Sequence, residues 1–318
     1  MAVTIDRVIE VVEYHLEHGE AETLSIYDIT SETLARYARQ YKRINTDFEM
    51  NATMLRIKEQ YSEAELKAIS KGGRLTPGLS KVPIIDFSGD IVTLGVMGDM
   101  HAGSKYFIES WFNSAFDEFA KAGVDYVVNV GDVVEGMSHR AGHIYELDYI
   151  GYDEQKKYAI KMLSQWKGPQ YFIDGNHDRW YIKAGNAGAL IVPDICAELP
   201  DATFLGHDEG NLVINGAVVK LWHGEDGSSY ATSYRVQKIA EAFSPGEKPN
   251  VLIAGHVHKA GYWPERSIHC VLAGAMSRQS NWMRRTRKAN HAGFWTIKMC
   301  INNGGIAWFE PRWYPFYS

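Results

Sequence analysis

Five short segments of the sequence each combine a glycine with one or more side chains that can bind a metal ion. They are Gly-Asp-Met-His at 98–101, Gly-Asp at 131–132, Gly-Asn-His-Asp at 175–178, Trp-His-Gly at 222–224 and Gly-His-Val-His at 255–258. Four of them follow an apolar run that predicts a strand. Carboxylate, amide and imidazole donors together are typical of hydrolytic sites that use two metal ions.

Each segment alone has an ordinary structural explanation. Asp and Gly are common in turns, and Asn and Asp are favoured at helix caps. The presence of all five segments in one chain is what indicates a metal-dependent hydrolase. His207, in Gly206-His207-Asp208, fits none of the five motifs, and we interpret it as a turn residue rather than as a further ligand.

The elements that must position these segments begin near residue 90. Apolar runs rich in β-branched residues, at 91–97, 126–130, 171–173 and 251–254, predict buried strands. Helical patterns at 107–122 and 153–166 separate the early runs, and Asn215-Gly216 between two apolar runs predicts a hairpin. This alternation predicts an α/β domain over residues 90–318.

The order Asp-x-His, Gly-Asp, Gly-Asn-His-Asp, His and Gly-His-x-His resembles the calcineurin-like metallophosphoesterase superfamily, over about residues 90–312. The resemblance implies an αββα sandwich, in which two facing sheets are covered by helices and the site lies at strand ends. It also implies a site for two divalent metal ions and hydrolysis of a phosphoester. The five motifs are specific for the superfamily but say little about the substrate.

Carried over by motif position, the resemblance implies seven metal ligands. One ion would be held by Asp99, His101 and His258, the other by Asn176, His223 and His256, and Asp132 would bridge the two. Such donors favour Mn²⁺, with Fe, Zn or Ni as alternatives, over calcium. A hydroxide bridging the metals would be the nucleophile that attacks phosphorus.

Two residues beside these ligands are expected to take part in catalysis. His177 would protonate the leaving oxygen or stabilise its charge. For Asp178 two interpretations stay open: it holds the imidazole of His177 in the required tautomer, or it caps a helix.

Several basic residues are candidates for binding the substrate. Residues 135–152 form an extra segment that contains His139, Arg140 and His143, which we interpret as a loop over the site rather than a plain surface loop. Arg179, with Trp180 and Tyr181, directly follows Gly-Asn-His-Asp and is expected to line the mouth of the site. The run 282–288 contains Arg284 and Arg285 beside a tryptophan, which suits phosphate contacts and base stacking but equally an ordinary charged hairpin tip.

The N-terminal part is expected to be a separate helical domain, residues 1–72, joined by a linker at 73–89. Apolar residues at helical spacing precede Gly19, which is placed to end the first helix. A later helix, capped by Thr30 or Ser31, carries Arg36, Arg39 and Arg43 on one face and Leu34, Tyr37 and Tyr41 on another. A capping box at 62–65 predicts a further helix, and Lys71 to Gly78 has a linker composition.

The basic helix leaves two interpretations open: a helix-turn-helix-like unit that binds DNA, or a structural helix with a solvated face. This unit, together with Gly-Asn-His-Asp, resembles the DNA-repair exonuclease branch and phage-type metallophosphoesterases. We therefore favour a phosphodiesterase or exonuclease acting on DNA. The alternatives are a phosphomonoesterase or cyclic-nucleotide phosphodiesterase, and a DNA-binding or assembly module with little catalysis. A homo-oligomer and a protein partner for processive nuclease activity also stay open.

The composition limits these choices. Of 318 residues, 45% are hydrophobic and 23% charged, and the formal net charge is -6, so any polyanion site must be a local basic surface. The three scattered cysteines, Cys196, Cys270 and Cys300, predict reduced, buried thiols rather than disulfides or a zinc ribbon. We find no apolar stretch of the about 18 residues that a membrane helix needs and no signal peptide. We expect a cytoplasmic protein without a membrane partner.

Overall fold

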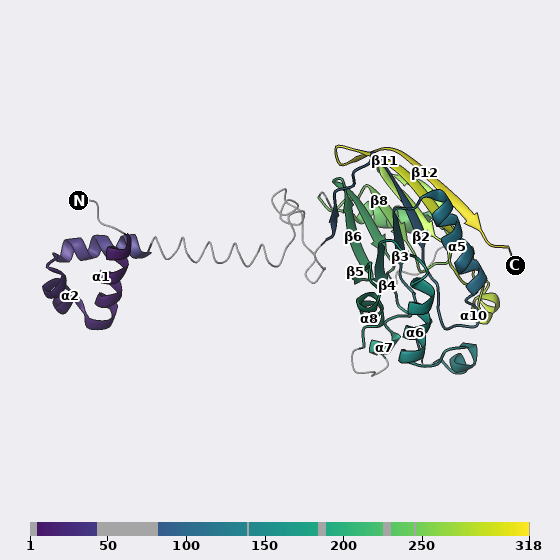
Figure 1. The fold of residues 1–318 in the computed structure, drawn as a ribbon, viewed down its shortest axis with the longest axis horizontal. Coiled ribbons are helices and arrows are strands. Elements are labelled where there is room, and N and C mark those ends of the chain that lie inside the picture. Colours follow the sequence, from purple (N-terminus) through teal and green to yellow (C-terminus); the bar gives the residue numbers. More distant parts are fainter. Residues whose placement is uncertain are drawn as a thin grey trace. The chain divides into compact units, whose positions relative to one another are not determined.

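The computed structural model describes residues 5–42, 82–138, 140–183, 189–224, 230–244 and 246–317. The chain divides into two compact units, Met1–Leu66 and Lys67–Ser318, and Figure 1 shows the ribbon of each. Among the described residues, no helix has both the length and the apolar character needed to cross a membrane.

The first unit is a small helical body. Helix α1 (Ile5–His18) ends before Gly19, α2 (Glu20–Tyr27) follows, and residues 31–42 form a third helix. The buried side chains of Val8, Val11, Val12, Leu34 and Tyr37 pack together as its core. The predicted apolar face of the basic helix is thus confirmed, because Leu34 and Tyr37 are buried there.

The N-terminus of the third helix is capped as expected, since the Thr30 hydroxyl accepts a hydrogen bond from the backbone N–H of Thr33, 3.2 Å away. Arg36 and Arg39 are exposed on this helix. Arg43, the helix predicted from the capping box and the predicted linker composition lie outside the described residues.

The second unit contains two six-stranded sheets. The strand order in the first sheet is β1 (Ile84–Ile85), β6 (Glu209–Ile214), β7 (Ala217–Trp222), β8 (Val251–Ala254), β10 (Ile268–Ala273) and β9 (Ala260–Glu265). The order in the second is β12 (Gly305–Pro315), β11 (Gly293–Asn302), β2 (Ile91–Met97), β3 (Tyr126–Val130), β4 (Gln170–Asp174) and β5 (Ala202–His207). The predicted strands and the Asn215-Gly216 hairpin between β6 and β7 are confirmed.

The two sheets face each other across a shared apolar core. Alternate residues of β2, Val92, Leu94 and Val96, are fully buried and pack with Ile253 and Val271 of the other sheet. This alternation follows from the period of two in a strand. The intervening residues face outward, where Gly95 leaves room for Phe119 of the covering helix.

Helices cover both outer faces. Helices α5 (Glu109–Ala122), α6 (Tyr152–Leu163) and α8 (Ile191–Glu198) pack on the second sheet. Helix α9 (Thr232–Ala242) packs on the first sheet through Val236 and Ala240. The short helices η1 (His143–Glu146), α7 (Trp180–Lys183) and α10 (Asn281–Arg285) lie in connections. The predicted αββα sandwich preceded by a small all-α part is confirmed.

Strand direction brings the five motifs together. Strands β2, β3 and β4 are parallel in one sheet, and β7 and β8 are parallel in the other. Four of the motif segments directly follow the carboxyl ends of their strands, and the fifth begins at Trp222, the last residue of β7. Parallel strands end at one edge of their sheet, which is where ligands bind in such folds.

Candidate metal centre

The backbone at the strand ends is held in an uncommon conformation. Five of the seven predicted ligands have positive φ: Asp99 (48°), His101 (53°), Asp132 (50°), His256 (72°) and His258 (52°). Each such residue costs of order 1–3 kcal/mol, which persists only where the surrounding structure fixes it. Asp and His tolerate this region better than branched residues do. The turns let the side chains leave the strand direction and converge.

Two motif glycines allow the loops to approach each other closely. A Cβ on Gly175 would lie 2.2 Å from Oδ1 of Asp132. A Cβ on Gly131, whose φ is 93°, would lie 2.6 Å from Nδ1 of His223. Any larger residue at either position would therefore displace a predicted metal ligand.

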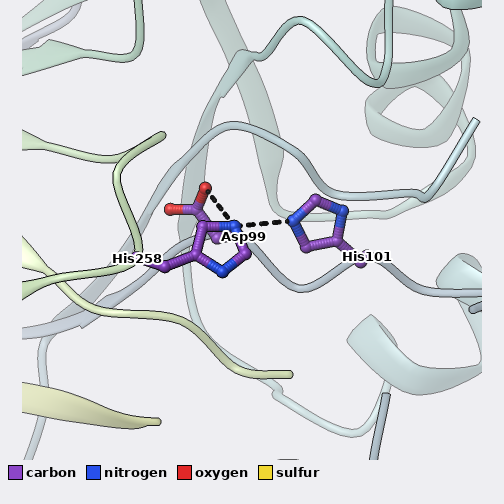
Figure 2. Close-up of side chains that lie close together, drawn as sticks. All are labelled: Asp99, His101 and His258. Atoms are coloured by element: carbon purple, nitrogen blue, oxygen red, sulfur yellow. Dashed lines mark hydrogen bonds and ion pairs between the residues drawn. The ribbon is translucent and has the colours of Figure 1, made fainter. Parts of the chain in front are cut away.

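The first group of ligands consists of Asp99, His101 and His258, whose donor atoms lie within 4.8 Å of one another. Figure 2 shows the His258 ring between the other two side chains. Nε2 of His258 lies 3.3 Å from Oδ1 of Asp99 and 3.0 Å from Nε2 of His101. Nδ1 of His258 lies 2.8 Å from Oδ1 of Asn290, and donation to that oxygen would leave Nε2 free to bind a metal.

The second group is built from Asp132, Asn176, His223 and His256. Oδ1 of Asn176 lies 3.1 Å from Nε2 of His223 and 2.8 Å from Nδ1 of His256. Nδ1 of His223 donates to the carbonyl oxygen of Val130 at 2.7 Å, which directs its Nε2 into the group. Oδ2 of Asp132 lies 3.3 Å from Nε2 of His223 and 3.9 Å from Nε2 of His101. Asp132 therefore stands between the two groups.

The charges of the site favour cations. Burial opposes protonation of His101 and His223, but neighbouring carboxylates, Glu135 for His101 and Asp132 for His223, raise the pKa of each to about 9. Burial lowers the pKa of His256 to about 4, so this imidazole is neutral and able to coordinate. Buried anions that draw protons onto neighbouring imidazoles offer the same attraction to a metal ion. The donor set therefore fits two divalent ions.

His177 lies beside the centre and lines its cavity. Its backbone N–H donates to Oδ1 of Asp132 at 2.8 Å, and its Nδ1 lies 3.0 Å from the carbonyl oxygen of Glu135. The ring packs against Trp180, with centroids 3.8 Å apart. With Nδ1 bonded to this carbonyl, Nε2 is the ring nitrogen left for a substrate.

Asp178 does not hold this ring, which corrects one of the two expectations for it. Its carboxylate accepts hydrogen bonds from the backbone N–H groups of Val133, Val134 and Gly175, at 3.2, 2.9 and 2.8 Å. Through these three hydrogen bonds the carboxylate joins the loop of Asp132 to the loop of Asn176. Asp178 is thus placed to shape the site through the backbone.

Glu135 is one of two residues of the site that the sequence patterns did not indicate. It is buried, its Oε2 lies 3.0 Å from Nδ1 of His101, and its Oε1 lies 2.8 Å from Nε2 of His143. Burial opposes ionisation of this carboxyl, but the surrounding His177, His101 and His143 hold its pKa well below its usual range. With His101 and His177, Glu135 forms a third group of potential ligands that overlaps the first. The feature of the sequence that could have identified Glu135 is its position three residues after Asp132, the predicted bridging ligand.

Arg235, on α9, is the second residue of the site that the sequence patterns did not indicate. This buried side chain donates to the carbonyl oxygens of His223 and Gly255. It therefore ties together the two loops that carry His223 and His256. No local pattern in the sequence distinguishes it from the exposed arginines.

A cavity of about 520 Å³ opens over the two groups. Its floor includes His101, Asp132, Asn176, His177, His256 and His258. The cations among its described lining residues are Arg140, Arg278 and Lys288, and the large aromatic ones are Tyr106, Trp180 and Trp282.

Segment 135–152 lines the cavity through Glu135, Ser138, Arg140 and Glu146, as expected for a loop over the site, and Trp180 lines it as well. Other residues predicted to bind substrate are placed differently from the expectation. Arg179 pairs with Asp208 and lies 3.5 Å from Asp174, so its guanidinium is paired with carboxylates beside the ends of β4 and β5. His143 is buried against Glu135 and Trp180, and Arg284 and Arg285 are exposed on α10 outside the described cavity lining. His139 lies outside the described residues.

Nδ1 of His207 is bonded to Oδ2 of Asp174, 2.5 Å away, and His207 is not part of either ligand group, as expected. It is the last residue of strand β5 rather than a turn residue, which corrects that part of its interpretation.

Comparison with known proteins identifies the class to which this fold and site belong. Residues 92–260 match the family of calcineurin-like phosphoesterases, and the chain belongs to that family. It is similar to the DNA polymerase II small subunit of Methanothermobacter thermautotrophicus, with 22% identity over an alignment of 258 positions that covers 65% of this chain and 52% of the relative. The chain thus spans about half the length of that curated relative.

Solved structures resemble the chain more distantly. An archaeal phosphodiesterase is 16% identical with a TM-score of 0.41, covering 71% of this chain and 100% of that one. Vacuolar protein sorting 29 of Cryptosporidium parvum is 13% identical with a TM-score of 0.38, covering 72% and 100%. A putative 5'-nucleotidase of Staphylococcus aureus is 10% identical with a TM-score of 0.42, covering 70% and 54%.

Proposed function

We propose that the chain is a dinuclear metal-dependent phosphodiesterase that acts on DNA. The observation that carries the dinuclear site is the position of Asp132, one of whose carboxylate oxygens faces His223 of one group and His101 of the other. A shared carboxylate is what two adjacent divalent ions need between them, because the ions repel each other.

The ligand roles follow from the two groups. Asp99, His101 and His258 would hold one ion, Asn176, His223 and His256 the other, and Asp132 both. The mixed oxygen and nitrogen donors suit Mn²⁺, with Fe, Zn or Ni as alternatives. When bound, the ions supply an activated water as nucleophile and neutralise charge on the phosphate.

The proton for the leaving oxygen comes from His177. Its Nδ1 donates to the carbonyl oxygen of Glu135, and its ring is held against Trp180, so Nε2 has a fixed direction. In the protonated state, Nε2 gives its proton to the oxygen that leaves phosphorus. Glu135 lies 3.6 Å from Nδ1 and stabilises that positive charge.

Three observations support DNA as the substrate. The cavity walls bring cations and large aromatic rings beside the ligand groups, a combination suited to nucleotides. The relative from Methanothermobacter thermautotrophicus is a subunit of a DNA polymerase. The N-terminal unit exposes Arg36 and Arg39 on one helix, which suits phosphate contacts.

The test is a substrate screen on the purified full-length chain, with Mn²⁺ and with chelator. The substrates are a nitrophenyl diester, the matching monoester, cyclic nucleotides and end-labelled DNA, and Asp132→Asn serves as the inactive control. We expect metal-dependent cleavage of the diester and of DNA. Hydrolysis of the monoester or of a cyclic nucleotide alone would overturn the assignment to DNA.

A further inference from the structure

One wall of the cavity is a separate feature, residues 277–288, which include α10 and are called the α10 wall here. Its beginning is joined to the first ligand group. The backbone N–H of Met276 donates to the carbonyl oxygen of Asp99 at 3.2 Å, and the Ser277 hydroxyl donates to the same oxygen at 3.3 Å. The end of the wall is joined to the same group through Asn290, which contacts His258 and donates to the carbonyl oxygen of Ser277 at 3.0 Å. The α10 wall is therefore anchored to the metal loops at both ends.

Helix α10 is also fixed in orientation. Met283 is buried and the Ser280 hydroxyl caps the helix. The Tyr106 hydroxyl accepts a hydrogen bond from the backbone N–H of Asn281 at 3.2 Å, and the Tyr106 carbonyl oxygen accepts one from the backbone N–H of Arg278 at 2.8 Å. Both Met283 and Trp282 line the cavity, and Trp282 remains 41% exposed.

The charges of the α10 wall are suited to an anion. Among the described lining residues it contributes Arg278 and Lys288 as its charged groups, and the cavity's carboxylates come from other segments. Nζ of Lys288 lies 5.7 Å from the centroid of the Trp282 ring. A large exposed ring with cations beside it can stack a base and contact the phosphate attached to it.

We propose that the α10 wall is a subsite for a nucleotide that neighbours the scissile phosphate. Trp282 stacks its base, and Arg278 and Lys288 contact its phosphate. This inference rests on the proposed function and extends it, because a base inside a duplex has both faces covered by its neighbours and can stack on Trp282 only after it leaves that stack. The site therefore takes single-stranded DNA or the frayed end of a duplex.

The test measures binding, so that it does not depend on turnover. Fluorescence anisotropy of a labelled thymidine oligonucleotide, in chelator, gives Kd for the full-length chain and its variants. Trp282→Ala should weaken binding about 5- to 150-fold, the range for loss of one stacked base. Trp282→Phe should retain most of the affinity, and Arg278→Ala should weaken binding and flatten its salt dependence.

The matched controls are on β12, outside the described cavity lining. Trp308 is 41% exposed, as is Trp282, so Trp308→Ala removes an equally exposed ring, and Arg312→Ala removes an arginine of the same strand. Both should bind as the wild type does. An oligomer of equal length without bases should bind the wild-type chain more weakly, and Trp282→Ala should not weaken that binding further.

The experiment distinguishes failure of the proposed function from failure of the subsite alone. If wild-type protein neither binds nor cleaves DNA, the proposed function fails and the subsite with it. If wild-type protein cleaves DNA but Trp282→Ala and Arg278→Ala bind it as tightly as the controls do, the subsite alone is wrong. Equal loss on the oligomers with and without bases would also overturn stacking. Should Trp282→Ala not fold, Trp282→Leu, which keeps apolar bulk, replaces it in every comparison.

Discussion

The Oε2 atom of Glu135 lies 3.0 Å from Nδ1 of His101, so one carboxylate touches a proposed metal ligand while its own backbone carbonyl holds the proposed acid, His177. Glu135 thus contacts both a proposed metal ligand and the proposed acid. Glu135 fixes which nitrogen of His101 faces the metal site, as carboxylates next to metal-bound histidines commonly do.

Glu135→Gln should therefore weaken both metal binding and catalysis. Loss of such a supporting carboxylate typically costs about 10- to 100-fold in metal affinity or activity. Metal titration by calorimetry and the rate on a nitrophenyl diester measure the two effects. Glu198→Gln makes the same change at an exposed ion pair with Lys156 on the outer helices and should alter neither. Wild-type metal affinity in Glu135→Gln would contradict this role.

Asp132→Asn should lose activity and most of one metal ion. The amide keeps the shape of the side chain but removes the shared negative charge that offsets repulsion between the ions. Elemental analysis of the purified variant should give clearly less metal per chain than the wild type. A fully loaded, fully active variant would show that Asp132 is not a bridging ligand.

His177→Asn should retain its metal while losing on the order of 10²–10⁴ in rate on substrates with poor leaving groups. A nitrophenyl diester has a leaving group that needs little protonation, so its hydrolysis should suffer less than DNA cleavage. The ratio of the two rates, compared with wild type, measures the acid role. Equal losses on both substrates, or loss of metal, would count against it.

The exposed arginines of the N-terminal unit should govern the salt dependence of DNA binding. Removing one cation that pairs with a phosphate lowers the salt slope by about 0.9 on duplex DNA, so Arg36→Ala with Arg39→Ala should flatten it and weaken binding. Titration at several salt concentrations measures this. The second unit has its own cores, and a chain lacking residues 1–75 should fold and keep its activity on the small diester. An unchanged salt slope in that chain would refute DNA binding by the N-terminal helices.

The three cysteines should differ in reactivity. All are free, and Cys196 and Cys270 are buried while Cys300 is partly exposed. Burial raises the pKa of Cys196 to about 12 and that of Cys270 to about 11, and the thiolate is the reactive form. At pH 8, iodoacetamide should modify Cys300 first in the folded protein and all three in denaturant, as read by mass spectrometry. Fast labelling of Cys196 or Cys270 in the folded state would contradict the buried arrangement.

Local sequence patterns were sufficient to predict an α/β domain, and the family resemblance carried by the five motifs supplied the sandwich fold and the candidate ligands. Strand periodicity is a local property, so the runs ending before Asp99, Asp132 and His256 identified strands correctly. The motif order then indicated, through the family resemblance, which side chains converge. The helical N-terminal part and its apolar face followed from spacing of the same kind.

The three-dimensional packing was needed to establish which polar groups meet around those ligands. Glu135, rather than Asp178, contacts the His177 ring, because the turn after β3 directs one carboxylate inward while the other accepts hydrogen bonds from backbone N–H groups. Arg278 lines the cavity, whereas Arg284 and Arg285, only a few positions further along, are outside its described lining. On α10, Met283 is buried and also lines the cavity, whereas its neighbours Arg284 and Arg285 are exposed. Such outcomes depend on packing between segments far apart in the chain, which local sequence patterns do not encode.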